Sequence, residues 1–107
     1  MRFETQFAIV SSGAQIADVE LRGADLFGLW APAVDSCAIT LRGSWDQTSA
    51  NYKVLTNPAG SGDWTFAVGP GDRAITLQDV AFPWPYLRIV CAVAQTVPRS
   101  LAVVTKL

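Results

Sequence analysis

The chain has 107 residues, half of them hydrophobic and 16% charged, and its eight basic and nine acidic side chains leave a net charge of −1. This balance excludes a nucleic-acid binder held by phosphate contacts, which needs a basic excess, and a disordered chain, which needs low hydrophobicity. The absence of histidine removes Ser-His-Asp and Cys-His catalysis and every His-ligated metal site, so the sequence predicts neither an enzyme nor a cofactor. We expect no membrane partner either, because no apolar run approaches the roughly 20 residues of a membrane span and no signal-peptide pattern follows Arg2.

Alternation of apolar and polar side chains, the pattern of half-buried strands, dominates the beginning of the chain. The first predicted strand covers residues 3–9 and places Phe3 and Phe7 on one face. The second predicted strand covers residues 17–21. The apolar run 26–30 predicts a third strand that is buried on both of its faces.

The alternation continues between clusters of turn-forming residues. Further strands are predicted over residues 37–41, 51–56, 64–68, 74–77, 86–91 and 101–106. Glycine, proline, asparagine and aspartate predict turns over residues 57–63 and 69–72. One helical turn is predicted over residues 78–82, and Pro83 prevents a longer helix. Within the strand that follows, Arg88 is expected to point outward.

The number and spacing of these segments predict an all-β fold. About eight or nine short strands, with turn signals at intervals of roughly 8–12 residues, are typical of an antiparallel β-sandwich of jelly-roll or Greek-key type. Residues 1–107 are therefore expected to form a single domain. Residues 1–10 are either an N-terminal arm that pairs with a neighbouring subunit or an ordinary edge strand of their own sheet.

The sequence contains few candidates for chemistry. Cys37 and Cys91 are expected to be buried, reduced core thiols, although neighbouring strands would also allow a disulfide. The aspartates in predicted turns are separated from one another, which indicates turn capping rather than a carboxylate pair or a Ca²⁺ site: Asp46, Asp63, Asp72 and Asp79. The two glycine clusters lack the lysine and the helix of a phosphate-binding loop.

Four tryptophans are many for a chain of this length. Trp30 and Trp64 fit a hydrophobic core, whereas Trp45 and Trp84 adjoin predicted loops and are harder to bury. The stiff apolar stretch 82–86, which contains Phe82, Trp84 and Tyr86, predicts an exposed patch that contacts another protein.

A second interpretation of the aromatic residues is carbohydrate binding. Exposed rings stack on sugars, and polar side chains nearby hold the hydroxyl groups. In this interpretation Trp45, Trp84 and Tyr52 are the stacking platforms, and Asp46 or Arg88 is the polar anchor.

Several stretches, in order along the chain, resemble a family of small β-sandwich proteins encoded among the head genes of tailed bacteriophages and of gene-transfer-agent-like elements. The resemblance covers roughly three-quarters of the chain, and each of its motifs is a pattern of apolar and turn residues. The matching stretches are Leu26 to Pro32, Ala38 to Asp46, Tyr52 to Leu55, Gly71 to Leu77, Phe82 with Tyr86 to Ile89, and Ala94-Gln95 with Arg99 to Val104.

The resemblance implies a virion structural protein that is made in the host cytoplasm and lies on the capsid surface. Its implied role is that of a decoration, or cement, protein that bridges neighbouring major capsid subunits and stabilises the head. Such subunits form closed oligomers, with a trimer as the default expectation. The expected partner interface consists of Phe3, Phe7, Trp45, Phe82, Trp84 and Tyr86. The alternative is a carbohydrate-binding β-sandwich module on the virion surface, with surface glycans as the partner.

Overall fold

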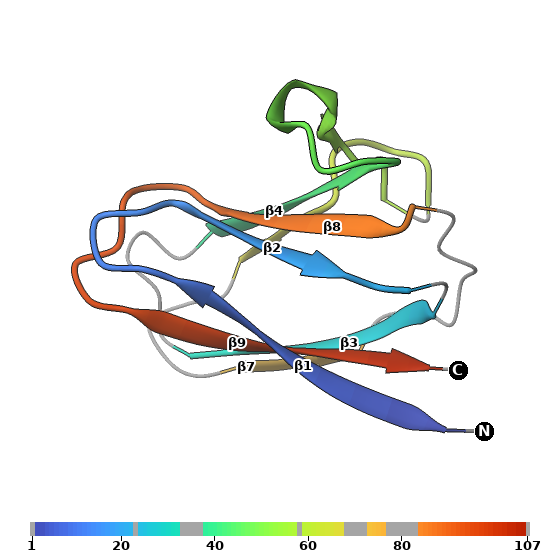
Figure 1. Ribbon diagram of the computed structural model, residues 1–107, viewed down its shortest axis with the longest axis horizontal. Helices are drawn as coiled ribbons and strands as arrows, with labels where there is room; N and C mark the ends of the chain where they lie inside the picture. Colours follow the sequence, from blue (N-terminus) through green and yellow to red (C-terminus); the bar gives the residue numbers. More distant parts are fainter. Residues whose placement is uncertain are drawn as a thin grey trace.

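The structure, a computed structural model, describes residues 2–22, 24–32, 38–57, 59–67, 73–76 and 84–106. These residues form two antiparallel sheets that pack face to face (Figure 1). Sheet A contains β1 (Phe3–Val10), β9 (Arg99–Lys106), β3 (Asp25–Ala31) and β7 (Arg73–Thr76), in that order. Sheet B contains β2 (Ile16–Glu20), β8 (Tyr86–Cys91), β4 (Ala38–Ser44) and β5 (Lys53–Val54), with β6 (Thr65–Ala67) also paired to β4. The predicted β-sandwich is confirmed.

The strand order is that of a jelly roll. Consecutive strands alternate between the two sheets, except for β4, β5 and β6, which follow one another within sheet B. Each sheet therefore joins strands that are distant in the sequence, such as β1 with β9 and β2 with β8. Jelly rolls occur both in viral capsids and in lectins, so the fold is compatible with either of the predicted functions and decides between neither.

The core lies between the two sheets and consists of the inward-facing members of the predicted alternation. Its fully buried aliphatic side chains come from both sheets: Val10, Ile39, Leu41, Leu87, Ile89, Leu101 and Val103. Trp64 and Phe66 pack against this core from the edge of sheet B, with their ring centroids 6.1 Å apart. Trp64 therefore fits its predicted core position.

One edge of β4 is shared by two short strands. β5 pairs with Arg42 and Gly43, β6 pairs with Ala38 to Thr40, and between them the backbone of Leu41 bonds to both Leu55 and Trp64. Asn57 and residues 59–63 leave the sheet at this point, within the range predicted to be a turn, and Thr56 forms an isolated bridge with Asp63. Gly60 takes a positive φ of 73° there, which a glycine adopts without strain. The predicted strand 51–56 is correspondingly shortened to two residues.

Within the described residues, the outer face of sheet A has no covering segment, and this corrects the prediction for residues 26–30. Leu26 and Leu29 are buried, but the side chain of Trp30 is 44% exposed. Trp30 is therefore not a core residue, and the strand is not buried on both faces. The strand β3 lies between β9 and β7, so both of its edges are paired within the sheet. The apolar run did not show that the outer face of β3 stays open, because no described segment covers that face.

The first strand belongs to sheet A of the same chain. β1 pairs with β9 along its whole length, from Phe3 opposite Lys106 to Val10 opposite Arg99, and the two termini lie close together in Figure 1.

Cys91 is fully buried in the core, whereas Cys37 lies outside the described residues, as does the helical turn predicted over 78–82. Within the described part of the chain, no helix is long and apolar enough to cross a membrane.

Candidate ligand-binding site

The segment that follows β4 is organised by the carboxylate of Asp46. Its Oδ1 accepts hydrogen bonds from the backbone N–H of Thr48 at 3.0 Å, from the Asn51 side chain at 3.1 Å and from the Ser44 hydroxyl at 3.3 Å. Its Oδ2 accepts hydrogen bonds from the indole Nε1 of Trp45 and from Asn51 Nδ2, both at 3.0 Å. The indole bond fixes the orientation of the Trp45 ring, which nevertheless stays 68% exposed. Asp46 thus caps its turn, as predicted, and also holds an exposed aromatic ring in place.

These hydrogen bonds make the site sensitive to acid. The hydrogen bonds from Asn51, Thr48, Trp45 and Ser44, that of Asn51 first, lower the pKa of Asp46 below its ordinary value of 3.8. A depressed pKa means that the ionised carboxylate stabilises the folded turn above the ordinary pKa, and that this contribution is lost as pH falls through the folded value.

We therefore expect the environment of Trp45 to be constant from neutral pH to about pH 5 and to change only in strong acid, below the ordinary pKa. Tryptophan fluorescence during an acid titration, compared with a Trp45→Phe protein to isolate the signal, measures this change. The variant Asp46→Asn, which has no carboxylate to titrate, should lack the transition. A transition of equal size in that variant would contradict the role given to Asp46.

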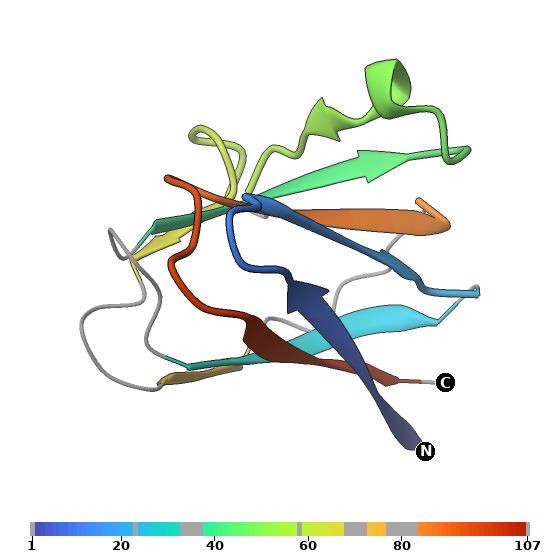
Figure 2. The ribbon, with the colours of Figure 1, turned by 60° about the vertical axis from the view of Figure 1, so that its left-hand side comes forward.

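A second cluster fastens the following segment to the outer face of sheet B. Arg88 donates from Nε and Nη2 to the two carboxylate oxygens of Asp18 on β2, at 2.7 and 3.0 Å, and from Nη1 to the hydroxyl of Ser49, at 2.8 Å. Its guanidinium lies over the ring of Tyr52, 3.9 Å from the centroid. Ser49 belongs to the short 3-10 helix η1 (Ser49–Asn51), so these contacts seat η1 and β5 against the sheet. Figure 2 shows this segment outside sheet B, on the side away from sheet A.

The same cluster explains two perturbed ionisations. The hydrogen bond to Asp18 raises the pKa of Arg88, which keeps the guanidinium charged. Burial, followed by the nearby charge of Asp18, raises the pKa of Tyr52. Tyr52 is only 2% exposed and Arg88 only 9% exposed, so neither can meet a ligand. Their predicted roles as a stacking platform and a polar anchor for sugar are therefore wrong, and the outward-pointing Arg88 is buried because Tyr52 covers it.

Gly43 creates space at the end of β4. A Cβ atom at this position would lie 2.9 Å from Cδ2 of Leu55 and 3.0 Å from Cγ of Trp84, so only a residue without a side chain allows both neighbours to come so close. Trp84 immediately precedes the Pro85–Tyr86 entry to β8, and its side chain remains 39% exposed. Gly43 therefore lets the Trp84 ring lie against the end of the sheet while part of the ring still faces solvent.

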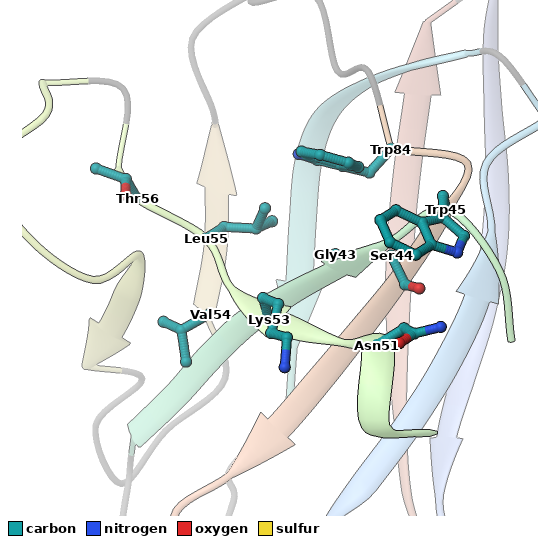
Figure 3. Close-up of a pocket in the computed structure, with 9 residues that line it drawn as sticks. All are labelled: Gly43, Ser44, Trp45, Asn51, Lys53, Val54, Leu55, Thr56 and Trp84. Carbon is teal, nitrogen blue, oxygen red and sulfur yellow. The ribbon is translucent and has the colours of Figure 1, made fainter. Parts of the chain in front are cut away.

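The two tryptophans share a pocket of about 380 Å³ (Figure 3). Its lining residues come from the end of β4, from η1 and β5, and from the entry to β8: Gly43, Ser44, Trp45, Asn51, Lys53, Val54, Leu55, Thr56 and Trp84. In the view of Figure 3 the two indole rings occupy one side of the pocket, and Asn51 and Lys53 occupy the other. The size falls within the range of roughly 300–1,000 Å³ for small-ligand sites, and the lining combines aromatic faces with a few polar groups, as such sites do.

The structure brings together two of the predicted interface residues and separates the others. Trp45 and Trp84 line the pocket, and Tyr86, which is half-buried, pairs with Ser44 at its edge without lining it. Phe3 and Phe7 lie on β1 in the other sheet, and Phe82 lies outside the described residues. The sequence did not mark Gly43, Asn51 and Lys53 as site residues. A glycine before a turn and two polar residues on either side of a tyrosine are common patterns that indicate no ligand site.

The outer face of sheet A forms a second surface, and one row across it is uncharged. The strand register places Phe7, Ala102, Trp30 and Ala74 in one row across β1, β9, β3 and β7. Phe7 is 67% and Trp30 is 44% exposed, and Phe3 and Ile9 extend the apolar surface along β1. A row of apolar side chains is unusual on the open face of a solvated sheet.

Comparisons with known proteins give little beyond the architecture. No protein-family model matches the chain, and no curated protein matches it. Among solved structures, the chain is similar to chitosan-binding module 1 of a chitosanase/glucanase from Paenibacillus sp. IK-5, with 14% identity and a TM-score of 0.44. The similarity covers 94% of this chain and 74% of that one. Similarity at this level carries no argument about a ligand, so the function has to be argued from the pocket itself.

Proposed function

We propose that this chain is a carbohydrate-binding β-sandwich module whose ligand site is the pocket between Trp45 and Trp84. The observation that carries the proposal is a pair of exposed indole rings at one pocket, one of them fixed in orientation by its hydrogen bond to Asp46. A sugar ring presents an apolar C–H face and a rim of hydroxyl groups. Exposed aromatic faces match the first, and polar side chains around them match the second.

The polar side chains needed for the hydroxyl rim are present. Within the described residues, Oδ1 of Asn51 and the side chains of Lys53 and Thr56 make no hydrogen bond, so they remain available to a ligand. Because Asp46 and the Arg88 cluster fix the segment before the ligand arrives, binding costs little ordering of the protein. A shallow, preorganised aromatic site of this kind is suited to adhesion rather than to catalysis.

The second candidate is the phage decoration protein implied by the family resemblance. The observation that favours it is the apolar row on sheet A, which would dock on the major capsid protein. The two candidate functions use different surfaces of the molecule. One protein could therefore bind a capsid through sheet A and a carbohydrate through the pocket.

One pair of matched variants separates the two candidates. Trp45→Ala is expected to weaken oligosaccharide binding by about tenfold or more, because a central aromatic contact commonly contributes at least about 1.4 kcal/mol. Trp30→Ala removes an exposed indole from the other sheet and should leave oligosaccharide binding unchanged. Titration calorimetry against a panel of oligosaccharides measures sugar binding by both variants. Co-sedimentation with empty phage capsids from the same source measures their binding to capsids.

The outcomes point in opposite directions. Loss of oligosaccharide binding only in Trp45→Ala supports the carbohydrate site, whereas loss of capsid binding only in Trp30→Ala supports docking through sheet A. A wild-type protein that binds no oligosaccharide at millimolar concentration would overturn the primary proposal. Saturable loading on capsids at a fixed ratio, by the same wild-type protein, would then leave the decoration role as the function.

A further inference from the structure

The charge of the pocket indicates which class of saccharide it accepts. Of its nine lining residues, Lys53 alone carries a charge at neutral pH. Among the described residues, ion pairs join Arg2 to Glu4 and Arg88 to Asp18, and Lys53 takes part in neither. The pocket therefore presents two aromatic faces and, on its opposite side, one lysine whose ammonium forms no ion pair within the described residues.

The Asp46 carboxylate beside the pocket is already engaged and is not available to a ligand. Asp46 does not line the pocket, and both of its oxygens already accept hydrogen bonds from Trp45, Asn51 and Thr48. A ligand that required a carboxylate would have to break these bonds and release the Trp45 ring. An amino sugar, which carries a positive charge, would thus meet the Lys53 ammonium without gaining a counter-ion.

We infer that the preferred ligand is an anionic saccharide, whose sugar ring stacks on the tryptophans while its negative group lies beside Lys53. This inference rests on the proposed carbohydrate function and specifies its substrate class. A lysine is a compact point charge without the two-pronged geometry of arginine, so it accepts a carboxylate or a sulfate group equally. The shared chemistry is one negative charge on the sugar.

The expected contribution is moderate and depends on salt. Lys53 is exposed, and an exposed ion pair contributes up to about 1 kcal/mol, which corresponds to about a fivefold preference for an anionic over a neutral saccharide. The preference should shrink as ionic strength rises, because salt screens exposed charges, while the stacking on tryptophan stays.

The test compares four trisaccharides by calorimetry at low and high salt: a galacturonic acid trimer, a sulfated trimer, a neutral galactose trimer and a glucosamine trimer. Wild-type protein is expected to bind both anionic trimers about fivefold more tightly than the neutral one and the glucosamine trimer most weakly. Lys53→Gln should abolish the difference between anionic and neutral trimers, and Lys53→Arg should keep it. Arg2→Gln, which removes a positive charge that does not line the pocket, is the matched control and should behave as wild type.

The possible failures are distinguishable. Binding of the neutral trimer as tightly as the anionic ones, or an undiminished preference in Lys53→Gln, would overturn the inference and leave the carbohydrate function standing. Binding of one anionic trimer only would support the inference and identify carboxylate or sulfate as the source of the charge. Failure of all four trimers to bind would overturn the carbohydrate proposal itself and the inference with it.

Discussion

Replacing Arg88 by methionine is expected to lower the free energy of unfolding by about 2–3 kcal/mol. Arg88 is almost fully buried, and its guanidinium joins Asp18 on β2, Ser49 in η1 and the ring of Tyr52. Methionine preserves much of the volume but removes three hydrogen bonds and the stacked cation. It also leaves the Asp18 carboxylate without its partner, although this carboxylate is 44% exposed and water replaces part of the loss.

The matched control is Arg2→Met, because Arg2 pairs with Glu4 at 3.2 Å but is 75% exposed. We expect the control to change the free energy of unfolding by less than about 0.5 kcal/mol. Chemical denaturation followed by tryptophan fluorescence measures both values. Equal effects of the two substitutions would show that the Arg88 cluster does not fasten η1 and β5. Arg88→Met should also weaken oligosaccharide binding, since Asn51 and Lys53 lie on the released segment.

Gly43→Ala is expected to damage the pocket directly. The added methyl group would lie 2.9 Å from Leu55 and 3.0 Å from Trp84, so at least one of these side chains must move. Overpacking of this kind costs about 1–3 kcal/mol, and displacement of the Trp84 ring should lower the affinity for an oligosaccharide by about tenfold. Affinity is measured by calorimetry, and the shift of the ring by the fluorescence emission maximum.

Gly62→Ala provides the control within the same chain. A Cβ at Gly62 would meet nothing within 4 Å, and its backbone does not adopt the positive φ that strains other residues. We expect the affinity and the free energy of unfolding of this variant to stay close to those of the wild-type protein. A Gly43→Ala protein that binds oligosaccharide as well as Gly62→Ala would show that ligand does not contact this end of β4.

The sequence by itself determined the fold class. The apolar–polar alternation located β1, β2 and β8 within one residue, because in a strand each side chain faces the sheet side opposite to that of its neighbour. The composition of residues 57–63 located the turn that leaves the edge of β4. Trp45 and Trp84 were also selected correctly as hard to bury, because each of them adjoins a turn.

Other features depended on contacts between distant segments. Alternation shows which residues share a face of a strand but not whether another segment covers that face. Trp30 appeared to belong to the core and is exposed because nothing described covers sheet A, whereas Arg88 and Tyr52 appeared accessible and bury each other. The pocket itself unites Trp45 with Trp84, which are 39 positions apart in the sequence. The pairing of β4 with β8 places them together. A binding site on a β-sandwich is formed by strand ends that are neighbours in space, and the tertiary structure decides which ends these are.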